Sequence, residues 1–163
     1  MTEHFNPQKV LEIALKVKES SQKLYQALSS KTADSQLKNL WDHLGQDSEF
    51  HSKVFKEMCQ DIESYVVYEL SAGEYDPYLS EITPGFRYTQ EAIGKKIKEL
   101  FVTDLEAVEF AIYVVIELIL VYSALKNCIV PEKLDIFNKI IGDEKKHLTK
   151  LNLAKRNLMA KPS

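Results

Sequence analysis

A glutamate and a histidine stand three positions apart in the segment Glu144-Lys145-Lys146-His147. On an α-helix this spacing places both side chains on one face, separated by roughly 60° around the axis, so that both can reach one metal ion. Alone, the pair is a weak indicator, because the same spacing occurs on many solvated helix faces and in polar core pairs. Its place on the helix, relative to the core, decides between these interpretations.

A second histidine occurs in a similar context earlier in the chain. The segments DSEFH at 47–51 and DEKKH at 143–147 align as Asp-x-x-x-His, and LYQAL around Tyr25 aligns with VYSAL around Tyr122. We infer an internal duplication of a helical hairpin, in which His51 corresponds to His147. The repeat makes the Glu144–His147 pair more specific than it is alone.

Four long helices are expected to carry these segments, over about residues 7–29, 34–64, 103–127 and 131–160. Pro7 after Asn6 is a typical helix start, and Thr103 with Glu106 forms a capping box. Few glycines and prolines interrupt the chain outside the long connection at 65–102, where a short helix is expected from Thr89. The pattern predicts an all-α fold, a ferritin-like antiparallel four-helix bundle with a long 2–3 crossover, as one domain over 1–163.

Each predicted helix carries an apolar stripe at alternating three- and four-residue steps, as a bundle core requires. In chain order the apolar members are Leu11, Ala14, Tyr25 and Leu28; Leu37, Trp41, Leu44, Phe55 and Met58; Val108, Ala111, Val115, Leu118, Tyr122 and Leu125; and Phe137, Ile140, Leu151 and Ala154. Polar residues interrupt three of the stripes near their middle: Lys18 and Ser21 on the first helix, Ser48 and His51 on the second, and Glu144 and His147 on the fourth. Burying an unpaired charge is costly. A polar layer in the core therefore needs a specific reason.

In these features the chain resembles the rubrerythrin branch of the ferritin-like superfamily, in particular its small members without a rubredoxin domain. The similarity covers nearly the whole chain and rests on LYQAL, VYSAL, LGQDSEFH, IIGDEKKH and a PYLSEI segment in the crossover. The resemblance implies two iron or manganese ions, held by a Glu seven residues before each helix tyrosine and by an E-x-x-H motif from each hairpin. It also implies peroxide reduction or oxygen-linked iron oxidation, dimerisation, and electrons supplied by rubredoxin.

Only half of the six ligand positions implied by this resemblance carry the expected residue type. The matching positions are His51, Glu144 and His147, and the substituted positions are Lys18, Ser48 and Val115. The nearby carboxylates Glu19, Glu49 and Glu117 lie one or two residues off the core stripes, rotated by about 100° or 200°.

The leading hypothesis is that Lys18 pairs with Glu144 in the space of a metal ion, while Ser48, His51 and His147 complete the hydrogen bonds. The ammonium group would also repel a divalent cation. This predicts a metal-free, non-catalytic bundle without a cofactor. In the plainest alternative Lys18 extends along the bundle to solvent.

Two enzymatic alternatives remain. In the first, Glu144, His51 and His147 form a two-histidine, one-carboxylate set that holds a single Fe, Mn or Zn ion. In the second, the ordinary family activity persists with ligands recruited from Asp47, Glu117 or the tyrosine-rich crossover. Either would make the chain a non-haem metal oxidoreductase acting in peroxide reduction or iron oxidation.

Composition narrows the classes of partner. The net charge of −3 provides no basic face for nucleic acid, and two cysteines without paired spacing exclude a disulfide scaffold. The apolar stretch from Ala111 to Leu125 is shorter than the roughly 20 residues of a membrane span and contains Glu117. The N-terminus lacks a basic leader, so the cytoplasm is the expected compartment.

The third helix has more apolar residues than one bundle seam needs, namely Ile112, Ile116, Ile119 and Leu120 outside its stripe. We therefore expect a homodimer that buries the excess. The two remaining histidines, His4 and His43, are predicted to be surface residues.

Overall fold

The computed structural model describes residues 7–65, 90–99, 101 and 103–161. The long helices in this part of the chain are α1 (Pro7–Lys31), α2 (Ser35–Gln60), α6 (Asp104–Leu125) and α7 (Leu134–Ala160). The shorter elements are α3 (Ile62–Tyr65), α5 (Gln90–Glu99) and the 3₁₀ turns η1 (Lys126–Cys128) and η2 (Pro131–Lys133). The tyrosine-rich segment and PYLSEI of the predicted crossover, and His4, lie outside the described residues.

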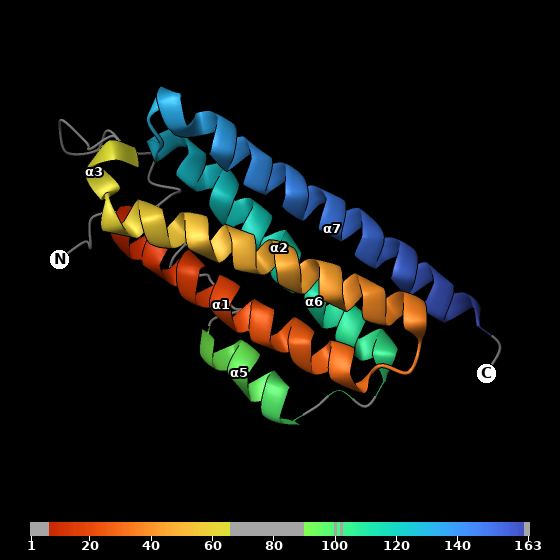
Figure 1. The fold of residues 1–163 in the computed structure, drawn as a ribbon. Coiled ribbons are helices and arrows are strands. Elements are labelled where there is room, and N and C mark those ends of the chain that lie inside the picture. Colours follow the sequence, from red (N-terminus) through yellow and green to blue (C-terminus); the bar gives the residue numbers. More distant parts are fainter. Residues whose placement is uncertain (1–6, 66–89, 100, 102, 162–163) are drawn as a thin grey trace, which may run out of the picture.

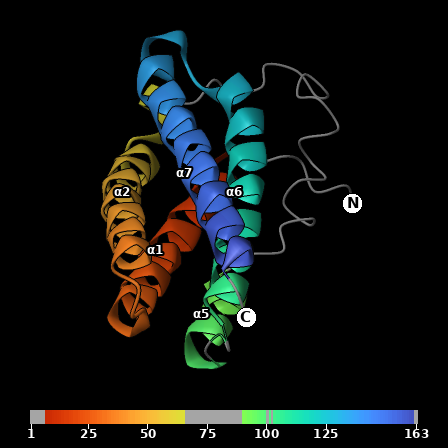
Figure 2. The ribbon, with the colours of Figure 1, turned by 90° about the vertical axis from the view of Figure 1, so that its right-hand side faces the viewer.

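The four long helices form two antiparallel hairpins, α1 with α2 and α6 with α7 (Figure 1). Helices α2 and α6 run in the same direction, as they must when a long crossover joins them (Figure 1). Figure 2 shows the two hairpins facing each other. Helix α5 packs on α1 (Figure 1). The predicted all-α, antiparallel four-helix bundle is confirmed.

Local sequence signals account for where the helices begin. Pro7 is the first residue of α1, and the Asp34 side chain accepts a hydrogen bond from the Leu37 N–H at 3.0 Å to cap α2. The Thr103 hydroxyl accepts from the Glu106 N–H at 3.1 Å and caps α6. Pro131 opens the 3₁₀ turn that leads directly into α7.

The predicted apolar stripes form the core. Their residues are buried, except that Leu28 and Ala154 at the ends are only partly buried. Helix α6 is long and apolar enough to cross a membrane by composition alone, but 56% of the relevant window is buried inside this bundle. Of the residues proposed for a dimer contact, Ile112 is itself buried within the chain, whereas Ile116 and Leu120 are exposed together with Tyr113.

Candidate functional site

A layer of polar side chains crosses the apolar core halfway along the bundle. Lys18 from α1, Ser48 and His51 from α2, and Glu144 and His147 from α7 are each at most 2% exposed. Helix α6 contributes the buried Val115 at its matching position. The sequence-predicted site residues are therefore all interior, which their apolar neighbours on each stripe require.

Glu144 is the centre of this layer. The Lys18 ammonium donates a hydrogen bond to Glu144 Oε1, and both side chains are inaccessible to solvent. His51 Nδ1 lies 3.2 Å from the same oxygen, and His147 Nδ1 lies 3.4 Å from Oε2. The lysine therefore does not extend to solvent along the bundle, and one carboxylate is shared by three basic side chains.

The electrostatics of the layer keep Glu144 ionised. Burial by itself raises the pKa of this carboxyl group, but the charge of Lys18 and the adjacent His147 and His51 rings outweigh burial and hold the pKa well below its usual value. The carboxylate and the ammonium thus compensate each other's charge inside the core.

Each histidine also meets an aspartate of the opposite hairpin. His51 Nε2 lies 3.1 Å from Asp143 Oδ2, and His147 Nε2 lies 2.7 Å from Asp47 Oδ2. Both Asp-x-x-x-His segments are evident in the sequence, but their crosswise pairing was not predicted. Their alignment in the duplicated hairpins was the available signal, because pseudo-symmetric hairpins present equivalent side chains to each other.

Ser48 departs from the expectation. Its hydroxyl is buried but has no hydrogen-bond partner among the described residues, so it does not take part in the Glu144 network. A serine carries its oxygen directly on Cβ, close to its own helix, and does not bridge the bundle as a longer side chain would. His51 Nδ1 is close to Glu144 but likewise lacks hydrogen-bond geometry.

Two buried tyrosines belong to the same core as the polar layer. The Tyr25 ring stacks on Trp41 with 5.8 Å between centroids, and Tyr122 contacts Phe55 at 5.1 Å. Burial, with a smaller contribution from the Glu144 charge, raises the pKa of both phenols above the ordinary value. Both are therefore neutral aromatic core residues at physiological pH.

The carboxylates considered as recruited ligands lie elsewhere. Asp47 contacts His147 at Nε2, the ring nitrogen opposite the one that faces Glu144, and Glu117 is only half-buried on α6. Glu19 and Glu49 are exposed, as their rotation off the stripes predicts.

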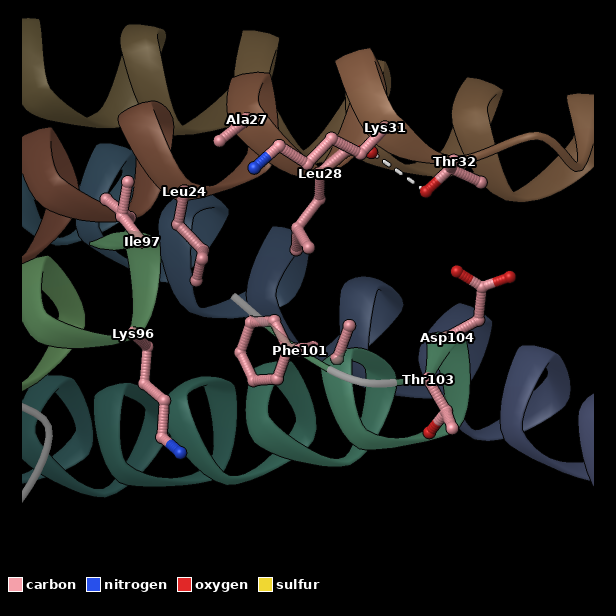
Figure 3. Close-up of a pocket in the computed structure, with 11 residues that line it drawn as sticks. Leu24, Ala27, Leu28, Lys31, Thr32, Lys96, Ile97, Phe101, Thr103 and Asp104 are labelled. Carbon is pink, nitrogen blue, oxygen red and sulfur yellow. Dashed lines mark hydrogen bonds between the residues drawn. The ribbon is translucent and has the colours of Figure 1, made fainter. Parts of the chain in front are cut away.

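A pocket of about 190 Å³ lies between α1, α5 and the start of α6. Figure 3 shows Leu24, Leu28 and Phe101 projecting into this space, with Lys31 and Asp104 at its edges. None of its lining residues belongs to the polar layer. The pocket therefore does not provide access to Glu144.

The fold and the layer define a ferritin-like protein. A solved structure of a ferritin-like diiron-carboxylate protein from Thermotoga maritima matches with a TM-score of 0.68 and 22% identity, over 94% of this chain and 96% of that one. The family model Rubrerythrin matches residues 9–155, and the chain belongs to this family. Among curated proteins, none matches this chain.

Proposed function

We propose that this chain is a rubrerythrin-family bundle in which a buried ion pair stands in place of the dimetal centre. The Lys18–Glu144 contact carries the proposal, because the ammonium group lies against the one carboxylate that the layer retains. Lys18, Ser48 and Val115 offer no anionic ligand, so the residues present do not fit two divalent ions. The chain then acts as a non-catalytic structural or binding bundle.

The size of the electrostatic repulsion between the Lys18 ammonium and a divalent cation supports this proposal. Two unit charges 4 Å apart interact by about 4 kcal/mol at an effective dielectric constant near 20, so an ammonium would repel a divalent ion by roughly 8 kcal/mol. That corresponds to more than five orders of magnitude in affinity, at about 1.4 kcal/mol for each factor of ten. A metal at Glu144 would have to displace or deprotonate Lys18.

One observation favours a second candidate, a mononuclear oxidoreductase site. Nδ1 of His51 and Nδ1 of His147 both lie within 3.4 Å of the Glu144 carboxylate, so a two-histidine, one-carboxylate set converges in the core. In this candidate function Lys18 leaves the carboxylate and one ion takes its place.

Metal loading separates the two candidates. The tag-free chain is incubated with Fe(II) or Mn(II), desalted and analysed for metal, and its peroxide consumption is measured. We expect wild type to retain no ion that His51→Asn lacks, and to consume peroxide no faster than the protein-free solution. A His51-dependent ion in the wild-type chain would support the mononuclear site, and two such ions would refute the loss of the centre.

A restored variant provides the matched positive control. Lys18→Glu, Ser48→Glu and Val115→Glu together recreate the six-ligand set implied by the family resemblance. In EDTA we expect this variant to be less stable than wild type, because its buried carboxylates repel each other, and to regain thermal stability with Fe(II) or Mn(II). The wild-type chain should show no gain in melting temperature with either ion that His51→Asn abolishes.

A further inference from the structure

A second group of potential metal ligands lies at the edge of the polar layer. His43 and Asp47 are one turn apart on α2, and His147 reaches them from α7. Asp47 Oδ2 lies 3.4 Å from His43 Nε2 and 2.7 Å from His147 Nε2, and the three ligand atoms lie within 4.8 Å of one another.

These separations are close to those of a tetrahedral site. Zinc–ligand bonds of about 2.0–2.1 Å at tetrahedral angles place neighbouring ligand atoms roughly 3.4 Å apart. The His43–Asp47 pair already has this separation. The Asp47–His147 pair is at hydrogen-bond distance and has to open by roughly 0.7 Å when a metal replaces the shared proton. Rotation of the exposed His43 ring supplies the remaining adjustment.

His147 is held in place from its other side. It is 2% exposed, and its Nδ1 lies 3.4 Å from Glu144 Oε2, so Nε2 is directed at Asp47. A carboxylate on the far nitrogen is the arrangement that orients metal-binding histidines and raises their basicity. Because Lys18 compensates the charge of Glu144, this support adds no net charge to the layer.

The internal repeat contains a natural comparison. In the opposite hairpin, Asp143 contacts His51 at 3.1 Å, but the position equivalent to His43 is Lys139, whose ammonium lies 2.9 Å from the Asp143 carboxylate. An ammonium group neutralises that aspartate and cannot act as a ligand while charged. At one edge of the layer the aspartate is thus paired with Lys139, whereas at the other edge it lies beside the potential ligand His43.

We propose that His43, Asp47 and His147 bind one divalent first-row transition ion, of which Zn²⁺ is the best match. Two imidazoles and one carboxylate suit zinc better than Ca²⁺ or Mg²⁺, which prefer oxygen ligands. The side chains of His43 and Asp47 are 43% and 30% exposed, so the fourth position is open to water. This site shares only His147 with the mononuclear alternative at Glu144.

Zinc titration of tag-free protein by calorimetry, with Co²⁺ as a spectroscopic probe, tests the proposal. We expect one Zn²⁺ per chain with micromolar or tighter affinity, and the visible absorption of four-coordinate Co²⁺. His43→Lys copies the opposite edge and should weaken binding by at least about tenfold. His51→Asn removes a ligand of the alternative mononuclear site at Glu144 but none of the proposed site, and should leave the zinc affinity unchanged. Circular dichroism checks the fold of each variant. Lys139→His should add a second ion.

Three results would overturn the proposal. They are no zinc binding by the wild-type chain, undiminished binding by both His43→Lys and His51→Asn, and loss of binding in His51→Asn but not in His43→Lys. The last result would place the ion beside Glu144 and would also contradict the proposed function, whereas the first two leave the proposed function intact. A folded Lys139→His variant without a second ion would contradict the argument from the repeat.

Discussion

The buried ion pair makes the effect of Lys18→Met calculable. The substitution keeps an unbranched side chain of similar length but leaves Glu144, which is inaccessible to solvent, without its ammonium partner. Removing one member of a buried pair costs about 3–5 kcal/mol. His147 Nδ1 remains 3.4 Å from Glu144 Oε2 as a hydrogen-bond partner, so we expect a loss near the lower end, about 3 kcal/mol.

Urea unfolding followed by fluorescence measures this loss. Trp41 is the single tryptophan of the chain, is fully buried and stacks on Tyr25, so its emission reports on the α1–α2 hairpin. A loss of about 3 kcal/mol should lower the melting temperature by roughly 6–12 °C in a domain of this size.

Two further variants show that the charge is responsible. Lys16→Met changes an exposed lysine of the same helix and should alter stability by less than about 0.5 kcal/mol. Lys18→Met combined with Glu144→Gln removes both charges and should regain about 2 kcal/mol, because no unpaired carboxylate remains buried. A loss below about 1 kcal/mol for Lys18→Met alone would refute the buried pair as the replacement for a metal.

Three other predictions concern separate parts of the fold. The pKa values of Tyr25 and Tyr122 are raised in the folded state, so the stability that these neutral phenols contribute to the fold is complete below about pH 10 and is lost as the pH rises further. Tyr25→Phe combined with Tyr122→Phe should therefore flatten the fall in melting temperature between about pH 10 and 12. An unchanged fall would contradict this prediction. Thr103→Ala removes the α6 cap and should cost about 1 kcal/mol in urea unfolding, whereas Thr103→Ser should be nearly neutral. Leu120→Glu, on the exposed face of α6, should convert the proposed homodimer to a monomer in light scattering, and a wild-type monomer at micromolar concentration would refute the dimer.

The sequence alone determined the helices and the faces that they bury. The stripes with Trp41, Val115 and Tyr122 were identified correctly, because a bundle core requires apolar residues at a helical period and little else can satisfy that pattern. The starts at Pro7 and Thr103 were also predictable, because capping depends on residues adjacent in the chain.

Only the tertiary structure decided which polar groups meet. The contact of Lys18 with Glu144 was a hypothesis from charge balance. It forms because the packing of the two hairpins lets the Lys18 side chain of α1 reach Glu144 of α7 across the core. The crosswise aspartate contacts and the position of His43 beside His147 were not expected, because they join helices far apart in the chain. A helical period specifies the direction of a side chain, but the packing of the two hairpins sets which atoms come within bonding distance.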